Sequence, residues 1–177
     1  MDTARLLLLL LLTAGAIALS WHAWWTQHAY GLFRFFAFEA IILLIILNSG
    51  RWFRDPLSGT QVVSWVLLVA SLLLAAHGVH LLRAVARAHI RWIEDTQSIV
   101  RIGAYRYIRH PLYASLLLFA WGVFLKGADL PSGALALAAT AFLIATAQHE
   151  EDFNIDRFGA AYSEYMKRTK MLIPFLL

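Results

Sequence analysis

Five apolar runs divide the chain, and they constrain its fold more than any other feature of the sequence. They lie at about 6–19, 29–47, 62–82, 112–125 and 133–147. A helix needs about 20 apolar residues to cross the hydrocarbon core of a bilayer, and its backbone must satisfy its own hydrogen bonds there. The runs therefore predict an all-α fold, a polytopic integral membrane helical bundle of about five transmembrane helices.

The composition agrees with a membrane protein and excludes several kinds of chemistry. Hydrophobic residues make up 60% of the 177 residues and charged residues 15%, which is more apolar surface than a soluble domain of this size can bury. The chain has no cysteine, so it offers neither a disulfide nor a thiolate nucleophile or metal ligand. Its net charge of +4 comes from basic residues that flank the apolar runs, which favours membrane lipid over nucleic acid as a partner.

The basic residues also predict an orientation in the membrane. In a five-span arrangement, ten Lys and Arg residues lie on the side of the C-terminus and four on the side of the N-terminus. By the positive-inside rule, the N-terminus is outside and the C-terminus cytoplasmic, in a membrane of the bacterial inner type. The first apolar run is either a retained helix, which we favour, or a cleaved signal peptide, and the orientation is the same in both cases.

We expect residues 1–177 to form a single membrane domain, because no repeat, low-complexity tract or long linker divides the chain. Residues 1–100 hold the N-terminal transmembrane helices and a cytoplasmic extension, and residues 101–177 hold a candidate functional core. Near the C-terminus, Phe158, Tyr162 and Tyr165 share one helical face and basic residues follow. This pattern predicts an amphipathic helix at the membrane interface, which Pro174 should end.

The first polar cluster runs from Gly103 to Tyr113 and contains the sequence Arg109-His110-Pro111. Proline suits the first turn of a helix and disfavours a helical conformation in the residue before it. A helix should therefore begin at Pro111, with Arg109 and His110 just outside an N-terminus that favours a carboxylate or phosphate. The alternative is structural: Arg109 contacts lipid headgroups, His110 caps the helix and the tyrosines form an aromatic belt.

The second polar cluster is His149 to Asp152, which closes the last apolar run. Its adjacent carboxylates, Glu150 and Glu151, repel each other and require a cation nearby. Neighbouring arginines meet this need in one interpretation, and a bound ammonium, sulfonium or ribose diol meets it in the other. A glutamate acting as a general base is a further possibility.

Together these motifs resemble a known family. Gly-x-Tyr-x-x-x-Arg-His-Pro-x-Tyr at 103–113, Glu-Glu at 150–151, Phe-Gly-x-x-Tyr-x-x-Tyr at 158–165 and Ile-Pro at 173–174 are similar to the isoprenylcysteine carboxyl methyltransferase family. The resemblance covers about residues 101–174, and the first hundred residues match only as apolar helices. It implies a helical bundle that binds S-adenosylmethionine in a cytoplasmic pocket, with a lipophilic methyl acceptor entering from the membrane.

The resemblance also assigns roles to residues of this sequence. Arg109 and Glu150 are the expected catalytic residues. Arg109 would orient an acceptor carboxylate, and Glu150, with Glu151 and His110 as alternatives, would deprotonate an amine or thiol. We expect Arg109 to contact the substrate. Glu39 lies in the second apolar run, outside the resemblance, and we expect it to contact the substrate because a carboxylate in mid-span has to be paired or protonated. We expect no metal site. The expected cofactor-binding residues are Tyr105, His110, Pro111, Tyr113, Glu150, Glu151 and Tyr162.

The sequence leaves open the identity of the methyl acceptor and two alternatives to a methyltransferase. An isoprenoid or prenylcysteine carboxylate, a phospholipid amine and a small thiol are all compatible with the motifs, and the oligomeric state is unknown. Membrane sterol reductases, which use NADPH, carry a similar Arg-His-Pro-x-Tyr segment. A small membrane transporter or assembly factor is the other alternative, with Glu39, His77 and His80 as its pathway residues.

Overall fold

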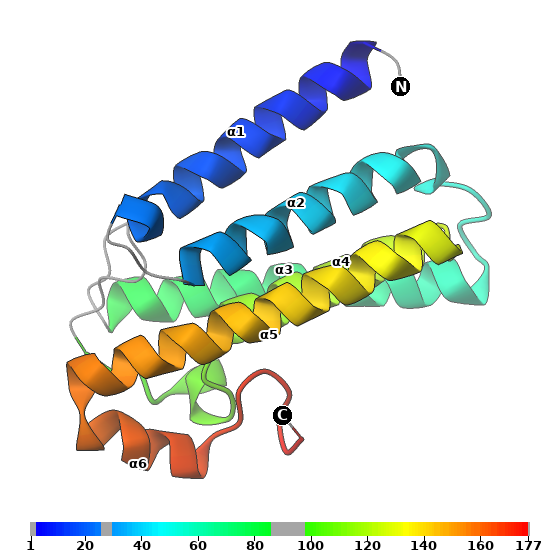
Figure 1. Cartoon of the computed structure of the whole chain (residues 1–177). Coiled ribbons are helices and arrows are strands. Elements are labelled where there is room, and N and C mark those ends of the chain that lie inside the picture. Colours follow the sequence, from blue (N-terminus) through cyan, green and yellow to red (C-terminus); the bar gives the residue numbers. More distant parts are fainter. Residues whose placement is uncertain (1–2, 26–29, 86–97, 177) are drawn as a thin grey trace. The chain divides into compact units, whose positions relative to one another are not determined.

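The computed structural model describes residues 3–25, 30–85 and 98–176, and the longer elements in these ranges are α-helices. Two short 3-10 helices, η1 and η2, lie between them (Figure 1). The elements in order are α1 (Thr3–Trp25), α2 (Tyr30–Asn48), η1 (Ser49–Arg51), α3 (Gly59–Ala84), η2 (Gly103–Arg106), α4 (Pro111–Phe124), α5 (Leu130–Phe158) and α6 (Ala160–Arg168).

Each of the five apolar runs lies, to within a residue at its ends, inside a helix of the described residues, so the prediction of an all-α membrane bundle is confirmed. Within the described residues, three helical segments are long and apolar enough to cross a membrane: Gly31–Arg51, Gly59–Ala84 and Leu130–Phe158. Leu9–Ala18 and Pro111–Phe124 are shorter apolar helical segments. The membrane type and the orientation of the termini stay predictions.

The chain divides into two compact units. Unit 1 comprises Met1–Val69 and Leu117–Thr146, and unit 2 comprises Ala70–Leu116 and Ala147–Leu177. The boundary falls within α3, α4 and α5, so each of these helices contributes to both units. The candidate residues of the two polar clusters all belong to unit 2.

In unit 1, α1 lies beside α2, and an apolar cluster built on Ala16, Ile42 and Ile46 joins them (Figure 1). The ring of Phe36 on α2 stacks on that of Phe142 on α5, with centroids 5.4 Å apart. Hydrogen bonds also join neighbouring helices. Ser64 Oγ on α3 donates to the carbonyl of Gly122 on α4 at 2.7 Å. These contacts come from small or apolar residues, as expected for packed membrane helices.

Unit 1 also holds a buried lysine at the loop between α4 and α5. Lys126 Nζ donates to Gln61 Oε1 at 3.0 Å and lies 3.6 Å from the centroid of the Trp65 ring. Beside it, Arg51 Nη1 pairs with Asp129 Oδ2 at 2.7 Å. Burial lowers the pKa of Lys126 because the ammonium loses hydration. We call these five residues the Lys126 cluster.

In unit 2, the chain reverses at Gly159, whose φ is +58°, and α6 folds back along the end of α5 (Figure 1). Glycine adopts this left-handed conformation without steric cost. The predicted C-terminal helix is present, but it ends at Arg168, before Pro174. Its aromatic face is buried inside unit 2, because the Tyr165 hydroxyl donates to the carbonyl of Tyr105 at 2.6 Å.

Candidate functional site

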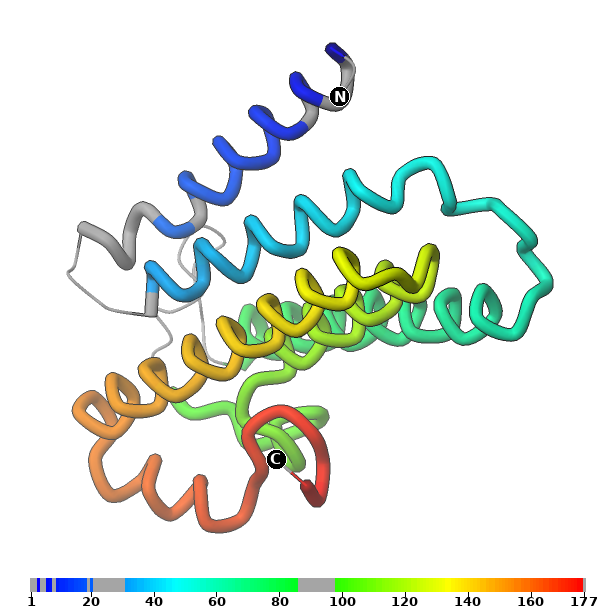
Figure 2. Tube along the Cα trace, turned by 45° about the vertical axis from the view of Figure 1, so that its right-hand side comes forward, coloured from blue at the N-terminus to red at the C-terminus, as the bar shows by residue number. Residues whose placement is uncertain are grey.

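The segment before α4 is held by the C-terminal tail, the residues that follow α6 (Figure 2). Lys170 N donates to the carbonyl of Tyr107 at 3.0 Å, Arg109 N donates to the carbonyl of Lys170 at 2.8 Å, and His110 N donates to that of Met171 at 3.1 Å. This short parallel pairing is centred on Ile108 and Lys170. It fixes the backbone of Arg109 and His110 immediately before the helix.

α4 begins at Pro111, as the sequence predicts. The carbonyl of His110 accepts the hydrogen bond of Ala114 N at 2.9 Å, so His110 is the residue directly before the first turn. The first N–H groups of a helix have no partner within it and carry the positive end of the helix dipole. The structure therefore brings these groups next to the Arg109 and His110 side chains.

A buried ion pair connects this segment to α5. Glu151 Oε1 accepts from Arg109 Nε at 2.5 Å and lies 3.2 Å from His110 Nε2, and all three side chains are less than one-tenth exposed. Arg109 Nη1 also donates to the carbonyl of Thr169 at 2.5 Å. Charge-assisted hydrogen bonds of this kind are strong, and a buried carboxylate needs them to offset its lost hydration. Arg109 thus ties the α4 start, α5 and the end of α6 together.

Glu150, next along α5, is in a different environment. Its Oε2 accepts a hydrogen bond from the Tyr113 hydroxyl at 2.5 Å, and the residue is half-buried. The Tyr113 ring stacks on the ring of His110, with centroids 5.5 Å apart and planes inclined by 23°. The two adjacent carboxylates therefore differ: Glu151 is bound by two basic side chains, and Glu150 by a phenol. We call Arg109, His110, Tyr113, Glu150 and Glu151 the Arg109 cluster.

Tyrosines surround these carboxylates. Burial raises the pKa of Tyr105 far above its ordinary value, and the charge of Glu150 adds to the shift. Burial likewise raises the pKa of Tyr162, and the charges of Glu151 and Glu150 add to it. Both phenols stay protonated at neutral pH. They present polarisable rings and neutral hydroxyls close to two negative charges.

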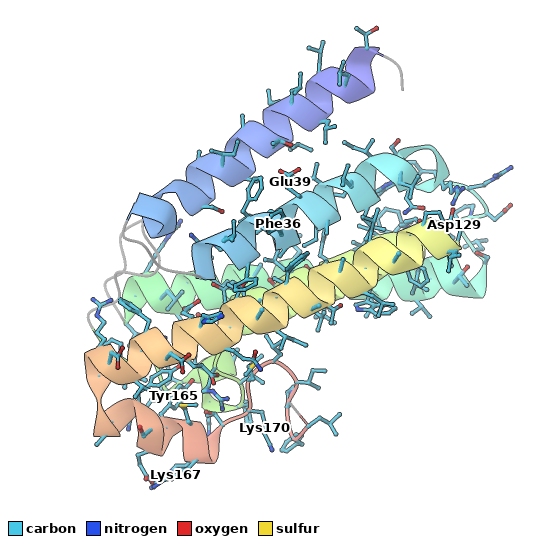
Figure 3. All side chains as sticks on the ribbon, in the orientation of Figure 1. Phe36, Glu39, Asp129, Tyr165, Lys167 and Lys170 are labelled. Atoms are coloured by element: carbon cyan, nitrogen blue, oxygen red, sulfur yellow. The ribbon has the colours of Figure 1, made fainter. Side chains whose placement is uncertain are left out.

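All the predicted cofactor-binding residues belong to unit 2. Glu39, the predicted substrate contact in the second apolar run, belongs to unit 1. Thr13 Oγ1 on α1 donates to Glu39 Oε2 at 3.2 Å, and Figure 3 shows Glu39 on the side of α2 that faces α1. A substrate contact by Glu39 stays a prediction. The predicted cofactor-binding residues, all of which lie in unit 2, are Tyr105, His110, Pro111, Tyr113, Glu150, Glu151 and Tyr162.

Some residues of the site have no signal in the sequence. The carbonyls of Met166 and Thr169 accept hydrogen bonds from Arg109, and backbone groups carry no residue-type pattern. His77, which the sequence offered only as a residue of a transporter pathway, accepts a hydrogen bond at Nε2 from Ala104 N at 3.3 Å and thereby supports the turn that carries Tyr105. No group of three or more metal-ligating side chains occurs in residues 3–25, 30–85 and 98–176.

Comparison with known proteins supplies the context for this arrangement. No family model matches the chain. The chain is 39% identical over 74 residues to methanethiol S-methyltransferase 2 of Bradyrhizobium diazoefficiens. The matched segment covers 41% of this chain and 27% of that protein. The chain is 32% identical over 72 residues to methanethiol S-methyltransferase of a Pseudomonas species, covering 40% and 26% of the two chains.

A plant relative matches over a slightly longer segment. The chain is 31% identical over 84 residues to the probable protein-S-isoprenylcysteine O-methyltransferase of rice, Oryza sativa subsp. indica, which covers 47% of this chain and 44% of that protein. The matches thus span less than half the length of these curated relatives. All three relatives are named as methyltransferases.

Proposed function

From its membership of the isoprenylcysteine carboxyl methyltransferase family, we propose that this chain is an integral membrane methyltransferase that uses S-adenosylmethionine. The observation that carries the proposal is the Arg109 cluster, in which a buried pair of ionised groups orders the residues around a second carboxylate. Such an arrangement holds charge where a charged ligand can meet it.

The polar and aromatic groups around the Arg109 cluster match the charged and polar groups of S-adenosylmethionine. S-adenosylmethionine supplies a methyl group on a positively charged sulfur, and it also carries an ammonium, a carboxylate and a ribose diol. Glu150, which accepts from one phenol, would receive the ammonium or the ribose hydroxyls. The N–H groups at the start of α4 and the His110 ring would hold the carboxylate. The rings of Tyr105 and Tyr162 offer faces that attract a cation.

Arg109 and Glu151 would act through their neighbours. Their mutual hydrogen bond and the bond from Arg109 to the Thr169 carbonyl fix the backbone and ring of His110 and the first turn of α4. Methyl transfer from a sulfonium is a direct displacement, so alignment and exclusion of water matter more than a covalent intermediate. The absence of cysteine from the chain is therefore no obstacle.

We propose a small thiol as the first acceptor to test. Two of the relatives are named for methanethiol, and a thiol has to lose its proton to become a good nucleophile. Glu150 is the candidate base, because its carboxylate is half-buried and is held in place by the Tyr113 hydroxyl. In this case it would contact the ribose hydroxyls and not the ammonium, because pairing with a cation would weaken it as a base. In this role Glu150 would accept the thiol proton, and bound S-adenosylmethionine would supply the methyl group and leave as neutral S-adenosylhomocysteine.

A carboxylate acceptor is the second candidate, favoured by the rice relative. A carboxylate needs no base, and Arg109 is the side chain that would orient it. Arg109 would then have to share its guanidinium between the acceptor and Glu151, which it contacts at 2.5 Å. A phospholipid amine would need deprotonation, as a thiol does. The NADPH-dependent reductase and the transporter find no support among the methyltransferase relatives.

Methyl transfer from isotopically labelled S-adenosylmethionine tests the proposal. The purified protein in lipid vesicles is given methanethiol, a prenylcysteine analogue or phosphatidylethanolamine, and the labelled product is identified. We expect label in the thioether, and about a 100-fold lower kcat for Glu150→Gln. Glu164→Gln, on the exposed face of α6, is the matched control and should retain activity.

Two results would redirect the proposal. Label in the prenylcysteine ester, unaffected by Glu150→Gln and reduced by Arg109→Lys, would favour the carboxylate acceptor. No transfer to any of the three acceptors, together with no binding of S-adenosylmethionine, would contradict the methyltransferase assignment.

The orientation can be tested separately. We propose that the N-terminus is outside and the C-terminus cytoplasmic, because the larger group of basic residues lies on the C-terminal side. Since the chain has no cysteine, a single cysteine in place of exposed Glu164 reports its side by labelling with an impermeant thiol reagent in intact cells. Labelling without permeabilisation would contradict the proposed orientation.

A further inference from the structure

A group of exposed apolar side chains lies in the C-terminal tail of unit 2. Phe175 is 84% exposed and Leu176 77% exposed, and Ile173 is also exposed. Leu172, directly before them, is 2% exposed and anchors the tail. Large apolar side chains that a folded backbone holds in the open mark a contact surface.

The backbone of this tail is fixed at both ends of the group. Lys170 is paired with Tyr107 and Arg109 through backbone hydrogen bonds of 3.0 and 2.8 Å, and Leu176 N donates to the carbonyl of Ile173 at 3.2 Å. Figure 2 shows the resulting bend of the tail after α6. The apolar side chains are therefore presented by an ordered turn.

Basic side chains accompany the apolar ones. Lys170 and Arg106 are exposed, and Tyr107, whose carbonyl pairs with Lys170 N, is also exposed. Figure 3 shows Lys170 beside the tail, and Lys167 on α6. The acidic group nearby on α6, Glu164, pairs with Lys167 and Arg168 at 3.2 and 3.1 Å. We call the following six residues the tail patch: Arg106, Tyr107, Lys170, Ile173, Phe175 and Leu176.

We propose that the tail patch inserts its apolar side chains into the interface of a membrane that contains anionic lipid. Phe and Leu gain by burial at the boundary of the acyl chains, and an aromatic ring with a hydroxyl, such as Tyr107, suits the headgroup level. Lys170 and Arg106 are attracted to the lipid phosphates. A purely apolar protein partner would have no use for these two cations, so the charge favours lipid.

The position of the tail patch gives the contact a consequence. Arg109 N and His110 N donate to the carbonyls of Lys170 and Met171. The tail segment that carries the patch therefore also fixes the backbone of two residues of the Arg109 cluster. A membrane that binds the patch therefore stabilises the backbone on which the cluster is built. The inference concerns lipid contact and stands independently of the methyl-transfer proposal.

A spin-label depth measurement tests the contact. Because the chain has no cysteine, Phe175→Cys and, as a control, Glu164→Cys each carry one nitroxide. Both variants are reconstituted into vesicles of phosphatidylcholine with phosphatidylglycerol, and collision with oxygen and with a polar nickel chelate is measured. We expect the label at 175 to favour oxygen and the label at 164, on exposed α6, to favour nickel.

The charge requirement is tested with the same label. Adding phosphatidylglycerol to phosphatidylcholine vesicles should deepen the label at 175, and Arg106→Gln with Lys170→Gln should abolish this shift. Lys167→Gln is the matched control, because Lys167 is already paired with Glu164, and it should leave the shift intact. Unchanged thermal unfolding of each variant verifies the fold.

Three outcomes would overturn the proposal. The first is a label at 175 that is as accessible to nickel as the label at 164. The second is a depth at 175 that does not respond to phosphatidylglycerol. The third is spin–spin broadening between labels at 175, which would show that a second copy of the chain covers the patch.

Discussion

The two units each contain a buried cationic side chain, and the surrounding residues stabilise the two cations in different ways. In unit 1, Lys126 is satisfied by the Gln61 amide and the face of Trp65. In unit 2, Arg109 is satisfied by the Glu151 carboxylate, with His110 on the same oxygen. The Lys126 cluster thus satisfies its buried ammonium with neutral groups, whereas the Arg109 cluster brings a second carboxylate, Glu150, next to the ion pair.

We propose that this difference separates a stabilising arrangement from a binding one. A buried lysine over an aromatic ring fixes the ends of helices and offers no group to a ligand. Two adjacent carboxylates concentrate negative charge, and a cation near either of them stabilises the pair. Arg109 and His110 serve Glu151. Glu150, bound by the neutral Tyr113 hydroxyl, is the group that a cationic ligand would complete.

The largest effect is expected from Glu151→Gln. The substitution keeps the shape of the side chain and removes the charge that neutralises buried Arg109. We expect the free energy of unfolding to fall by about 3 to 5 kcal/mol, with loss of S-adenosylmethionine binding. Thermal unfolding in detergent measures the first effect and calorimetry the second. An unchanged stability would mean that the ion pair does not organise unit 2.

Lys126→Met should have a smaller effect that is confined to stability. It leaves Gln61 Oε1 without the donor that it now has at 3.0 Å, which costs about 1 to 3 kcal/mol. Affinity for S-adenosylmethionine should not change, because the Lys126 cluster has no proposed part in binding. A loss of affinity without a loss of stability would contradict the separation of the two clusters.

Tyr113→Phe should affect activity and leave stability nearly unchanged. The ring that stacks on His110 is retained, and the hydroxyl that donates to Glu150 at 2.5 Å is lost. A hydrogen bond to a charged group is worth about 1.5 to 3 kcal/mol, so we expect kcat/KM for a thiol to fall about tenfold or more. Wild-type kinetics would show that Tyr113 does not position Glu150.

The smallest effect concerns the ion pair at the edge of the Lys126 cluster. The hydrogen bonds from Arg51 and Ser132 hold the pKa of Asp129 at about 2, below its ordinary value of 3.8. Because the folded pKa is lowered, the stability from this carboxylate is fully present above pH 3.8 and is lost as the pH falls through 2. Asp129→Asn should therefore unfold at a lower temperature at pH 5, and the difference should shrink towards pH 2. A difference independent of pH would exclude the ionised pair as its cause.

The sequence predicts the helices well because their signal is local. The run at 29–47 and α2 (Tyr30–Asn48) agree within a residue at each end, and α4 begins at the predicted Pro111. The run ending at 147 stops eleven residues before α5 does, at Phe158. Polar residues such as His149 end an apolar pattern without ending a helix, so hydropathy marks the membrane and not the helix.

The site was predictable in its residues and not in its pairing. The motifs single out Arg109, His110, Glu150 and Glu151, and the structure brings them into contact. Arg109 contacts Glu151 and not Glu150 because of the rotation of α5 about its axis. The sequence does not predict this rotation, because the two adjacent residues are both glutamate. The Lys126 cluster also escaped prediction, because Gln61 and Lys126 are 65 residues apart and belong to no motif.

Calorimetric titration of S-adenosylmethionine, with NADPH in parallel, into the detergent-purified protein tests the central claim most directly. It is done on the wild type, Glu150→Gln and Lys126→Met. The account predicts that S-adenosylmethionine alone binds, that Glu150→Gln weakens binding and that Lys126→Met leaves it unchanged. Binding of NADPH alone, binding of neither cofactor, or equal binding to wild type and Glu150→Gln would contradict it.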